Sequence, residues 1–238
     1  DGCRAPVILR LAIATLQAGG PVSGPERHIG GIMYTLYARN GAGSLAVEAL
    51  LAACGADYKV IVLNRKPDGS FEDFFHAINP KAEVPTLVLP DGSVMTESAA
   101  MMIHICEQHP AAGLAPAPGA PGRAQFLRWQ VYLAAALYGS DLRLFYPHRF
   151  TTDAAGAEGV KARAAEMMMH EFAIYADALG EGPFMLGRLS ALDIYAAMLC
   201  SWAPDVGELF ATYPNLKRMY DAVVANEAVQ KVWARNEM

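Results

Sequence analysis

The stretch from Asn79 to Ser98 constrains the fold of this chain more than any other, because it combines proline, turn residues and a helix start. Thr86 to Leu89 is rich in β-forming residues, Pro90 to Gly92 is typical of a turn, and Val94 to Thr96 predicts a second short strand. The residues that follow predict a helix. The stretch is therefore expected to be a β-hairpin that leads directly into a helix.

Both ends of this hairpin carry groups suited to binding. The Val84-Pro85 bond is a candidate cis peptide, because X-Pro is the only common place for one. Such a bond can leave the N–H and C=O of Val84 unpaired at a sheet edge, where an extended peptide binds as an added strand. Glu97 and Ser98 bring a carboxylate, a hydroxyl and free backbone N–H groups to the helix start. We expect Glu97 to bind the ammonium, and Ser98 the carboxylate, of an amino-acid end.

Motifs along much of the chain resemble those of the glutathione transferase superfamily. The run N-P-x-x-x-V-P-T-L, followed by D-G-x-x-x-T-E-S, is similar to the glutathione-binding half of that family, whose first domain is thioredoxin-like. Leu36-Tyr37 and the loop from Gly41 to Ser44 resemble its first strand and the start of its first helix. Leu186 to Asp193 resembles the buried capping motif of its all-helical second domain, and Pro214 to Leu216 fits a late helix. The resemblance covers about residues 33 to 236.

The resemblance and the residue pattern together predict two domains. A chain of 238 residues, 53% of them hydrophobic, is long enough to bury two modest cores. We expect an α/β thioredoxin-like, glutathione-binding domain over residues 33–109, a linker rich in Pro, Ala and Gly over 110–122, and an all-α acceptor-substrate domain over 123–238.

Residues 1–32 are interpreted as a disordered or non-native leader. A signal peptide is the alternative, but Arg10 interrupts its apolar stretch.

The expected elements alternate in the first domain and are all helical in the second. The first domain is expected to have strands at 33–37, 58–63, 86–89 and 94–96, and helices at 44–54, 71–78 and 98–109. The second is expected to have helices at 123–146, 154–179 and 190–202, followed by two that begin at Pro214 and Ala228. A βαβ unit followed by a hairpin predicts a mixed sheet covered by helices.

Composition excludes several classes of partner. A net charge of −5 without a basic cluster argues against nucleic acid, and no apolar run reaches the ~20 residues of a membrane helix. The four cysteines form no CxxC pair, which fits a reducing, cytoplasmic compartment. The six histidines show no ligand spacing, so no metal site is expected.

The resemblance implies a protein that lowers the pKa of the glutathione thiol. A free thiol has a pKa of about 8.5, and a hydroxyl donor at a helix N-terminus lowers it. Ser44 is the expected thiol contact, with a simple helix cap as the competing interpretation. Tyr37 is the alternative donor, although a tyrosine at a strand end is more often packing.

Two features depart from the pattern of bacterial beta-class members. Those proteins carry a cysteine in the loop just before the helix serine, whereas this chain has Gly43, which excludes a mixed disulfide there. Their His-Lys pair on the first long helix of the second domain is matched here by Tyr138 and Gly139. The identity of the activating group is therefore open at this stage.

The resemblance also implies how the two substrates bind. Val84, beside Pro85, is expected to pair its backbone with the cysteinyl part of glutathione, and Lys81 is a candidate for a carboxylate. Glu83 replaces a usual Gln or Lys, so it is expected to point away unless a cation lies nearby. The γ-glutamyl end is assigned to Glu97 and Ser98. The acceptor pocket is expected between the domains, beside the loop 39–42, with Tyr132, Tyr138 and Phe145 as lining.

These features predict a cytoplasmic, homodimeric glutathione transferase without a metal, whose co-substrate is glutathione and which conjugates it to small apolar electrophiles. Two alternatives stay open. The first is a glutathione-dependent isomerase, ether-cleaving enzyme or peroxidase on the same fold. The second is a non-catalytic glutathione-binding or scaffold protein, which Gly43 and the missing His-Lys pair favour.

Overall fold

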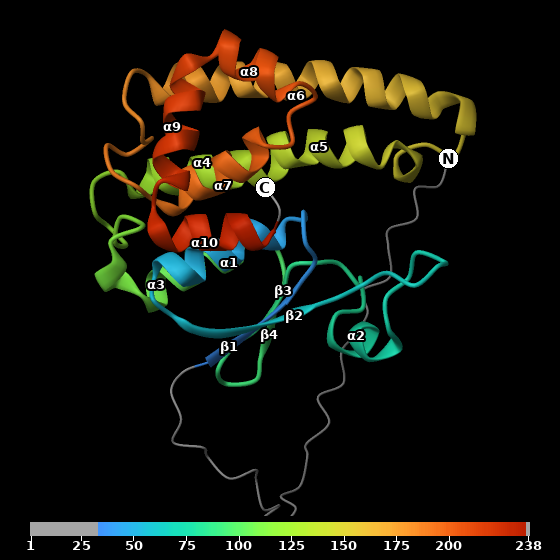
Figure 1. Ribbon diagram of the computed structural model, residues 1–238, viewed down its shortest axis with the longest axis horizontal. Coiled ribbons are helices and arrows are strands. Elements are labelled where there is room, and N and C mark those ends of the chain that lie inside the picture. The colour runs from blue at the N-terminus through green and yellow to red at the C-terminus, as the bar shows by residue number, and fades with distance from the viewer. Residues whose placement is uncertain (1–32, 237–238) are drawn as a thin grey trace, which may run out of the picture. The chain divides into compact units, whose positions relative to one another are not determined.

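The computed structural model describes residues 33–236, which form a mixed four-stranded sheet and a large group of helices (Figure 1). The strands are β1 (Met33–Ala38), β2 (Asp57–Val62), β3 (Thr86–Val88) and β4 (Val94–Met95). The predicted leader, residues 1–32, lies outside the described residues.

The sheet has the order β2-β1-β3-β4, with β1 parallel to β2 and antiparallel to β3. Leu36 at the centre of β1 pairs with Val60 of β2 and Leu87 of β3, and all three side chains are apolar. Strands β3 and β4 form the expected antiparallel hairpin. The predicted mixed sheet, a βαβ unit followed by a hairpin, is confirmed.

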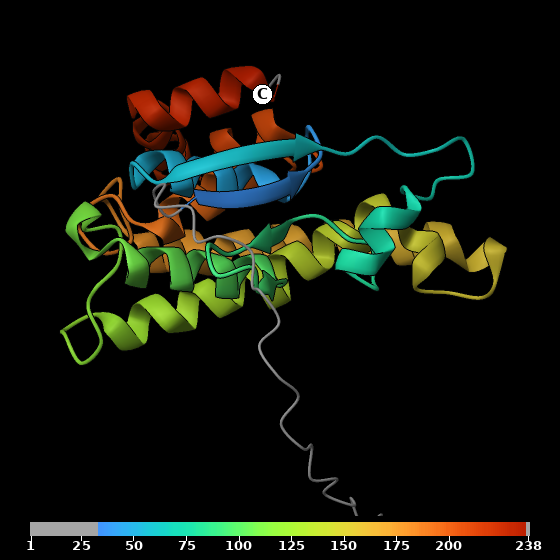
Figure 2. The same ribbon diagram turned by 90° about the horizontal axis from the view of Figure 1, so that it is seen from below.

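Two apolar clusters lie on opposite faces of this sheet. Successive side chains of a strand point to opposite faces. Leu36 accordingly joins the large core with the helices α1 (Ser44–Ala53) and α3 (Ser98–Gln108). Its neighbour Tyr37 joins a small cluster with Phe75 of the short helix α2 (Asp73–Ile78). The loop between β2 and α2 extends away from the sheet (Figure 2).

The first long helix of the second part contains an irregular turn. It runs through α4 (Arg123–Tyr132), a π-helical turn (Leu133–Leu137) and α5 (Tyr138–Phe145). The sequence predicts one regular helix over 123–146, whereas the structure interrupts this helix with the π turn. Such turns widen a helix by one residue and are frequent at functional sites.

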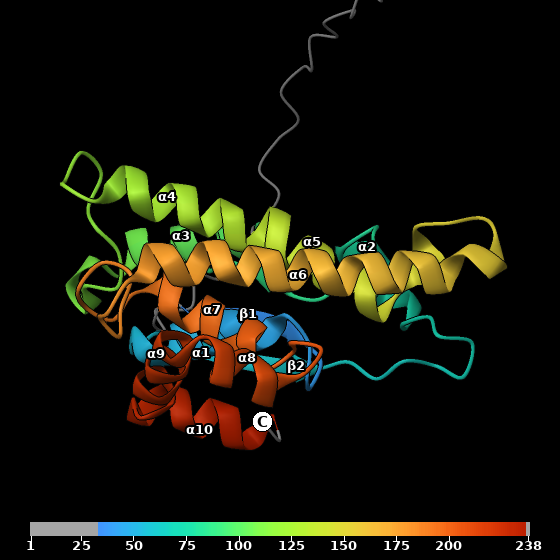
Figure 3. The ribbon, with the colours of Figure 1, turned by 90° about the horizontal axis from the view of Figure 1, so that it is seen from above.

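The other helices build the core around α7. They are α6 (Ala157–Leu179), α7 (Ala191–Cys200), α8 (Val206–Thr212), α9 (Pro214–Val224) and α10 (Glu227–Arg235). Every residue of α7 is buried, α9 packs on it, and α10 packs on α1 (Figure 3). The sequence does not predict α8, because seven residues are too few to show a helical period. No helix between residues 33 and 236 is long and apolar enough to cross a membrane.

The predicted capping box at the start of α7 is confirmed. Ser190 donates to Asp193 through both its hydroxyl (2.7 Å) and its backbone N–H (2.8 Å), and the N–H of Met185 donates to the other carboxylate oxygen (2.9 Å). Burial raises the pKa of Asp193 to about 6, while these hydrogen bonds act in the opposite direction. The box fixes the start of the buried helix.

Candidate functional site

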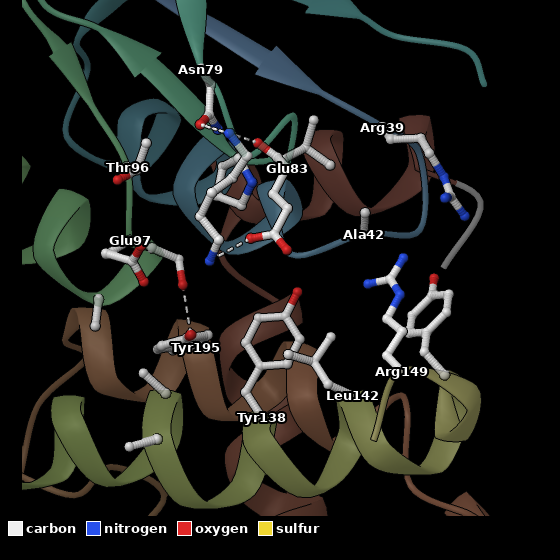
Figure 4. A pocket seen from close by; sticks show the side chains of 18 of the residues that line it. Arg39, Ala42, Asn79, Glu83, Thr96, Glu97, Tyr138, Leu142, Arg149 and Tyr195 are labelled. Atoms are coloured by element: carbon white, nitrogen blue, oxygen red, sulfur yellow. Dashed lines mark hydrogen bonds and ion pairs between the residues drawn. The ribbon is translucent and has the colours of Figure 1, made fainter. Parts of the chain in front are cut away.

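A cavity of about 440 Å³ lies between the sheet and the helices α4, α5 and α7. Its lining comes from the loops after β1 and β2, the loop before β3, the start of α3, the face of α4–α5 around the π turn, the turn after α5, and α7. Glu97 and Tyr195 lie at one end, Arg39 and Arg149 at the other, and Tyr138 between them (Figure 4). The site is therefore elongated, with chemically different ends.

All five residues predicted to bind glutathione line this cavity: Lys81, Val84, Pro85, Glu97 and Ser98. The Val84-Pro85 bond is cis, as expected. Within residues 33–236 the backbone N–H and C=O of Val84 make no hydrogen bond, since β3 begins only at Thr86. A main-chain donor and acceptor are thus free beside the cavity.

Asn79 holds the loop that carries these groups. Its buried side-chain amide donates to the carbonyl of Glu83 (3.0 Å) and to the hydroxyl of Thr86 (2.9 Å), and its amide oxygen accepts from the N–H of Lys81 (3.1 Å). Asn79 belongs to the motif identified in the sequence, but this positioning role depends on contacts that only the fold reveals.

A cation lies next to Glu83, which was the condition for an acidic residue at this position of the site. Its carboxylate lies 2.9 Å from the ammonium of Lys81, and both side chains are mostly exposed. Hydrogen bonding and charge from Glu83 raise the pKa of Lys81. Exposed pairs of this kind contribute only about 0 to 1 kcal/mol, so a ligand carboxylate can compete for the lysine.

Glu97 stands at the start of α3 in an unusual backbone conformation. Its φ of +65° lies in the left-handed region, and its carbonyl accepts from the N–H of Met101 (3.0 Å). A residue other than glycine held in this region costs about 1 to 3 kcal/mol, and such strain clusters at binding sites.

Ser98, the first residue of α3, bonds to a tyrosine that sequence reasoning missed. Its hydroxyl lies 2.7 Å from the hydroxyl of Tyr195 on α7, which also lines the cavity. Burial raises the pKa of Tyr195 well above its ordinary value, so the phenol is neutral. Its signal in the sequence is weak, because it is a single tyrosine in a helix that is otherwise apolar after Asp193.

Neither of the two predicted thiol contacts lines the cavity. Helix α1 begins at Ser44 with Gly43 at the cap position, so the predicted capping role of Ser44 is wrong. The Ser44 hydroxyl accepts from the N–H of Arg39 (3.2 Å) and donates to its carbonyl (3.1 Å), which fixes the loop instead. Tyr37 packs against Phe75, with ring centroids 5.5 Å apart, on the opposite face of the sheet.

The hydroxyl of Tyr138 reaches the loop before α1 from the opposite wall of the cavity. A Cβ built at Gly43 would overlap this hydroxyl and lie 3.0 Å from two carbons of the ring. The ring packs against Tyr195 and Trp202, with centroids 6.3 and 5.7 Å away. Burial raises the pKa of Tyr138 well above its ordinary value, although a backbone hydrogen bond from Gly43 acts in the opposite direction. Tyr138 therefore stays a neutral hydroxyl donor.

The chain is similar to known proteins in sequence and in fold. The family model described as glutathione S-transferase, N-terminal domain, matches residues 44–108. The uncharacterized GST-like protein YncG of Escherichia coli K12 is 28% identical over 208 residues, which span 87% of this chain and all of that protein. A solved sphingomonad glutathione S-transferase complexed with glutathione has a TM-score of 0.73 at 29% identity, covering 86% of this chain and 99% of that one. In sequence over residues 44–108 and in overall fold, the chain is similar to the glutathione S-transferase superfamily. Glutathione S-transferase GstA of Escherichia coli O157:H7 is a further relative, 27% identical over 71% of this chain and 81% of its own length.

The two departures from the beta-class pattern meet in space. Gly43 stands where the beta-class cysteine is expected, and Tyr138 stands at the position of the expected histidine. The tyrosine hydroxyl fills the volume that a side chain at position 43 would need. Glycine at position 43 and tyrosine at position 138 are therefore sterically compatible with each other, whereas a side chain at position 43 would overlap Tyr138.

Only some of the residues predicted to line the acceptor pocket face the cavity. Tyr138 lines the cavity, as does the loop at Arg39 and Ala42. Tyr132 does not, because its hydroxyl donates to the carbonyl of Glu171 (3.1 Å) and its ring packs on Trp129.

Phe145 also lies off the cavity, with 55% of its surface exposed at the end of α5. Residues of α4, the π turn, α5 and the turn after it line the cavity instead: Val131, Ala134, Ala135, Leu142, Tyr146 and Arg149. Over residues 33–236, no group of three His, Cys, Asp or Glu side chains is arranged to hold a metal ion.

Proposed function

We propose that this protein binds glutathione in the cavity and presents its thiolate for attack on an electrophilic carbon. The observation that carries the proposal is the convergence of the free Val84 backbone and the Glu97-Ser98 helix start on one cavity. Relatives named glutathione S-transferase, and a neighbour solved with glutathione, support it.

The chemistry of the cavity suits each part of the tripeptide. The γ-glutamyl ammonium binds Glu97, and its carboxylate binds Ser98 and the free N–H groups at the start of α3. The cysteinyl main chain pairs with the N–H and C=O of Val84 as an added strand. This register directs the cysteinyl side chain toward Tyr138, which lies between the two ends of the cavity.

Tyr138 replaces Ser44 and Tyr37 as the hydroxyl that we assign to the thiol. It is the neutral phenol that faces the cavity beside the start of α1. Its O–H donates to the sulfur anion, and the helix N-terminus adds a favourable potential. The thiol proton leaves to solvent, the sulfur forms a bond to the carbon of the acceptor, and the leaving group departs with its electron pair.

The proposal is tested by calorimetric titration of glutathione into wild-type protein and Glu97→Gln. Losing the ammonium partner is expected to weaken binding by about tenfold or more. Glu158→Gln is the matched control, because Glu158 is in the first turn of α6 and does not line the cavity. Absence of glutathione binding to the wild type would overturn the proposal, and equal binding to Glu97→Gln would remove Glu97 from the site.

We also propose a cytoplasmic, two-fold homodimer. Large apolar side chains at the surface support an interface, among them Phe74 (50% exposed) and Leu127 (37% exposed). Sedimentation equilibrium of wild type and Phe74→Ser tests this proposal, which requires a dimer for the wild type.

A further inference from the structure

We propose that the electrophilic substrate carries a carboxylate, which binds between Arg39 and Arg149 at the end of the cavity opposite Glu97. The inference rests on the proposed glutathione site and names the class of acceptor that this site takes. An acceptor of this class has an apolar body, an electrophilic carbon near Tyr138 and a terminal anionic group.

The two arginines reach the same space from different walls. Arg39 belongs to the loop after β1, where both its backbone N–H and its C=O bond to the hydroxyl of Ser44. Arg149 ends the short 3-10 turn Pro147–Arg149 that follows α5, and its guanidinium stacks 4.3 Å above the ring of Tyr146. Their side chains extend toward each other across the cavity (Figure 4). The backbone of one and the guanidinium of the other are therefore held in place.

Their positive charges have no acidic partner in the part of the chain that the structure describes. Neither Arg39 nor Arg149 forms an ion pair there. Two carboxylates line the cavity: Glu83 is paired with Lys81, and Glu97 lies at the far end. Two guanidinium groups that face each other repel, and a bound anion removes that repulsion.

Guanidinium groups favour a carboxylate as this anion. Each presents a planar fork of N–H donors that matches the two oxygens of a carboxylate, and charge-assisted bonds of this kind are the strong ones. Arg65 is a third arginine in the cavity lining, but it stacks on Phe71 and donates to the carbonyl of Gly69 in its own loop. Arg39 and Arg149 are therefore the arginines available to the ligand.

The two arginines lie beyond Tyr138 as seen from Glu97 (Figure 4), so the anion between them belongs to the acceptor and not to glutathione. In the proposed register glutathione places its γ-glutamyl end at Glu97 and its thiol at Tyr138. Lys81 lies on the wall that carries Val84 and suits the second carboxylate of the tripeptide. Leu142 offers an apolar wall for the body of an acceptor. The sequence predicts an apolar acceptor, and the arginines add an anionic end to it.

Two product analogues test the inference without requiring turnover: S-benzylglutathione and S-(4-carboxybenzyl)glutathione, titrated by calorimetry. Wild-type protein is expected to bind the carboxylated analogue about tenfold more tightly. Arg39→Gln and Arg149→Gln should each reduce that preference by about threefold or more, and Arg149→Lys should retain part of it. The control is Arg163→Gln, because Arg163 is exposed on α6, pairs with Glu166 and does not line the cavity.

Other outcomes overturn the inference in distinguishable ways. Equal affinity for the two analogues in the wild type would show that no carboxylate site exists. If Arg39→Gln and Arg149→Gln weaken glutathione and both analogues by the same factor, the arginines bind the tripeptide and not the acceptor. If neither glutathione nor either analogue binds, the proposed function fails, and this inference fails with it.

Discussion

The hydroxyl of Tyr138 occupies the volume that a side chain at Gly43 would need. Tyr138 therefore restricts position 43, which lies 95 residues earlier in the chain, to glycine. Gly43 has ordinary helical dihedral angles, with φ −58° and ψ −9°. Backbone strain therefore does not require glycine here. The requirement is steric, and it comes from Tyr138.

Gly43→Ala is expected to lower the free energy of unfolding by about 1 to 3 kcal/mol, because the new Cβ overlaps the Tyr138 ring and hydroxyl. In a Tyr138→Ala background the same change should cost much less. Urea unfolding of the four proteins in this double-mutant cycle measures the coupling. Gly159→Ala is the control, because a Cβ there has no neighbour within 4 Å. Equal costs in the two backgrounds would show that Tyr138 does not exclude a side chain at position 43.

Asn79→Ala is expected to destabilise the loop before β3. It removes the amide donor from the hydroxyl of Thr86 and the carbonyl of Glu83, which keep only their hydrogen bond to each other (2.9 Å), and the two lost hydrogen bonds cost about 1 to 3 kcal/mol. Glutathione affinity should fall as well, because this loop presents Val84. Chemical denaturation and calorimetry measure the two effects, and unchanged affinity would contradict the positioning role.

Tyr195→Phe removes the partner of the Ser98 hydroxyl and leaves the ring in place. We expect glutathione affinity to fall, by less than about tenfold, because one neutral hydrogen bond orients the serine. Tyr175→Phe is a useful comparison, since Tyr175 is a buried tyrosine that does not line the cavity. An equal effect of both substitutions on glutathione affinity would contradict this role of Tyr195.

Asp141 is expected to make stability decrease as pH rises. Burial raises the pKa of this carboxyl to about 7 from an ordinary value of 3.8, and no hydrogen-bond partner for its Oδ1 is found in residues 33–236. Between these values the folded protein binds more protons than the unfolded chain, so the contribution of Asp141 to stability falls from about pH 4 to pH 7. Asp141→Asn should flatten this dependence and be more stable than the wild type at pH 8 by roughly 1 to 3 kcal/mol. Denaturant unfolding at pH 5 and pH 8 tests the sign, which is contradicted if the substitution is destabilising at pH 8.

Local residue chemistry explains which features could be predicted from the sequence. The hairpin, the Val84-Pro85 cis bond and the capping box at Ser190 each depend on residues that are close together in the chain. The residues next to the hairpin line the cavity because the hairpin positions its sequence neighbours. The helices are predicted for the same reason, since their apolar periodicity is also a local pattern.

The missed features depend on contacts between distant segments. The orientation of Ser44 follows from the carbonyl and N–H of Arg39, and the place of Tyr138 follows from the packing of α5 against the loop before α1. The facing arginines come from two loops whose approach has no local signal. Local patterns therefore predict the lining at the Glu97 end of the cavity better than the lining at the arginine end.

The most direct test of the central claim is an ultraviolet difference titration of the thiolate of bound glutathione across pH. It is run on wild type, Tyr138→Phe and Tyr132→Phe, a tyrosine of the same long helix that does not line the cavity. We predict a thiol pKa well below the free value of about 8.5 in the wild type and in Tyr132→Phe, and a return toward that value in Tyr138→Phe. Bound glutathione with an unshifted thiol pKa in all three proteins would contradict the account.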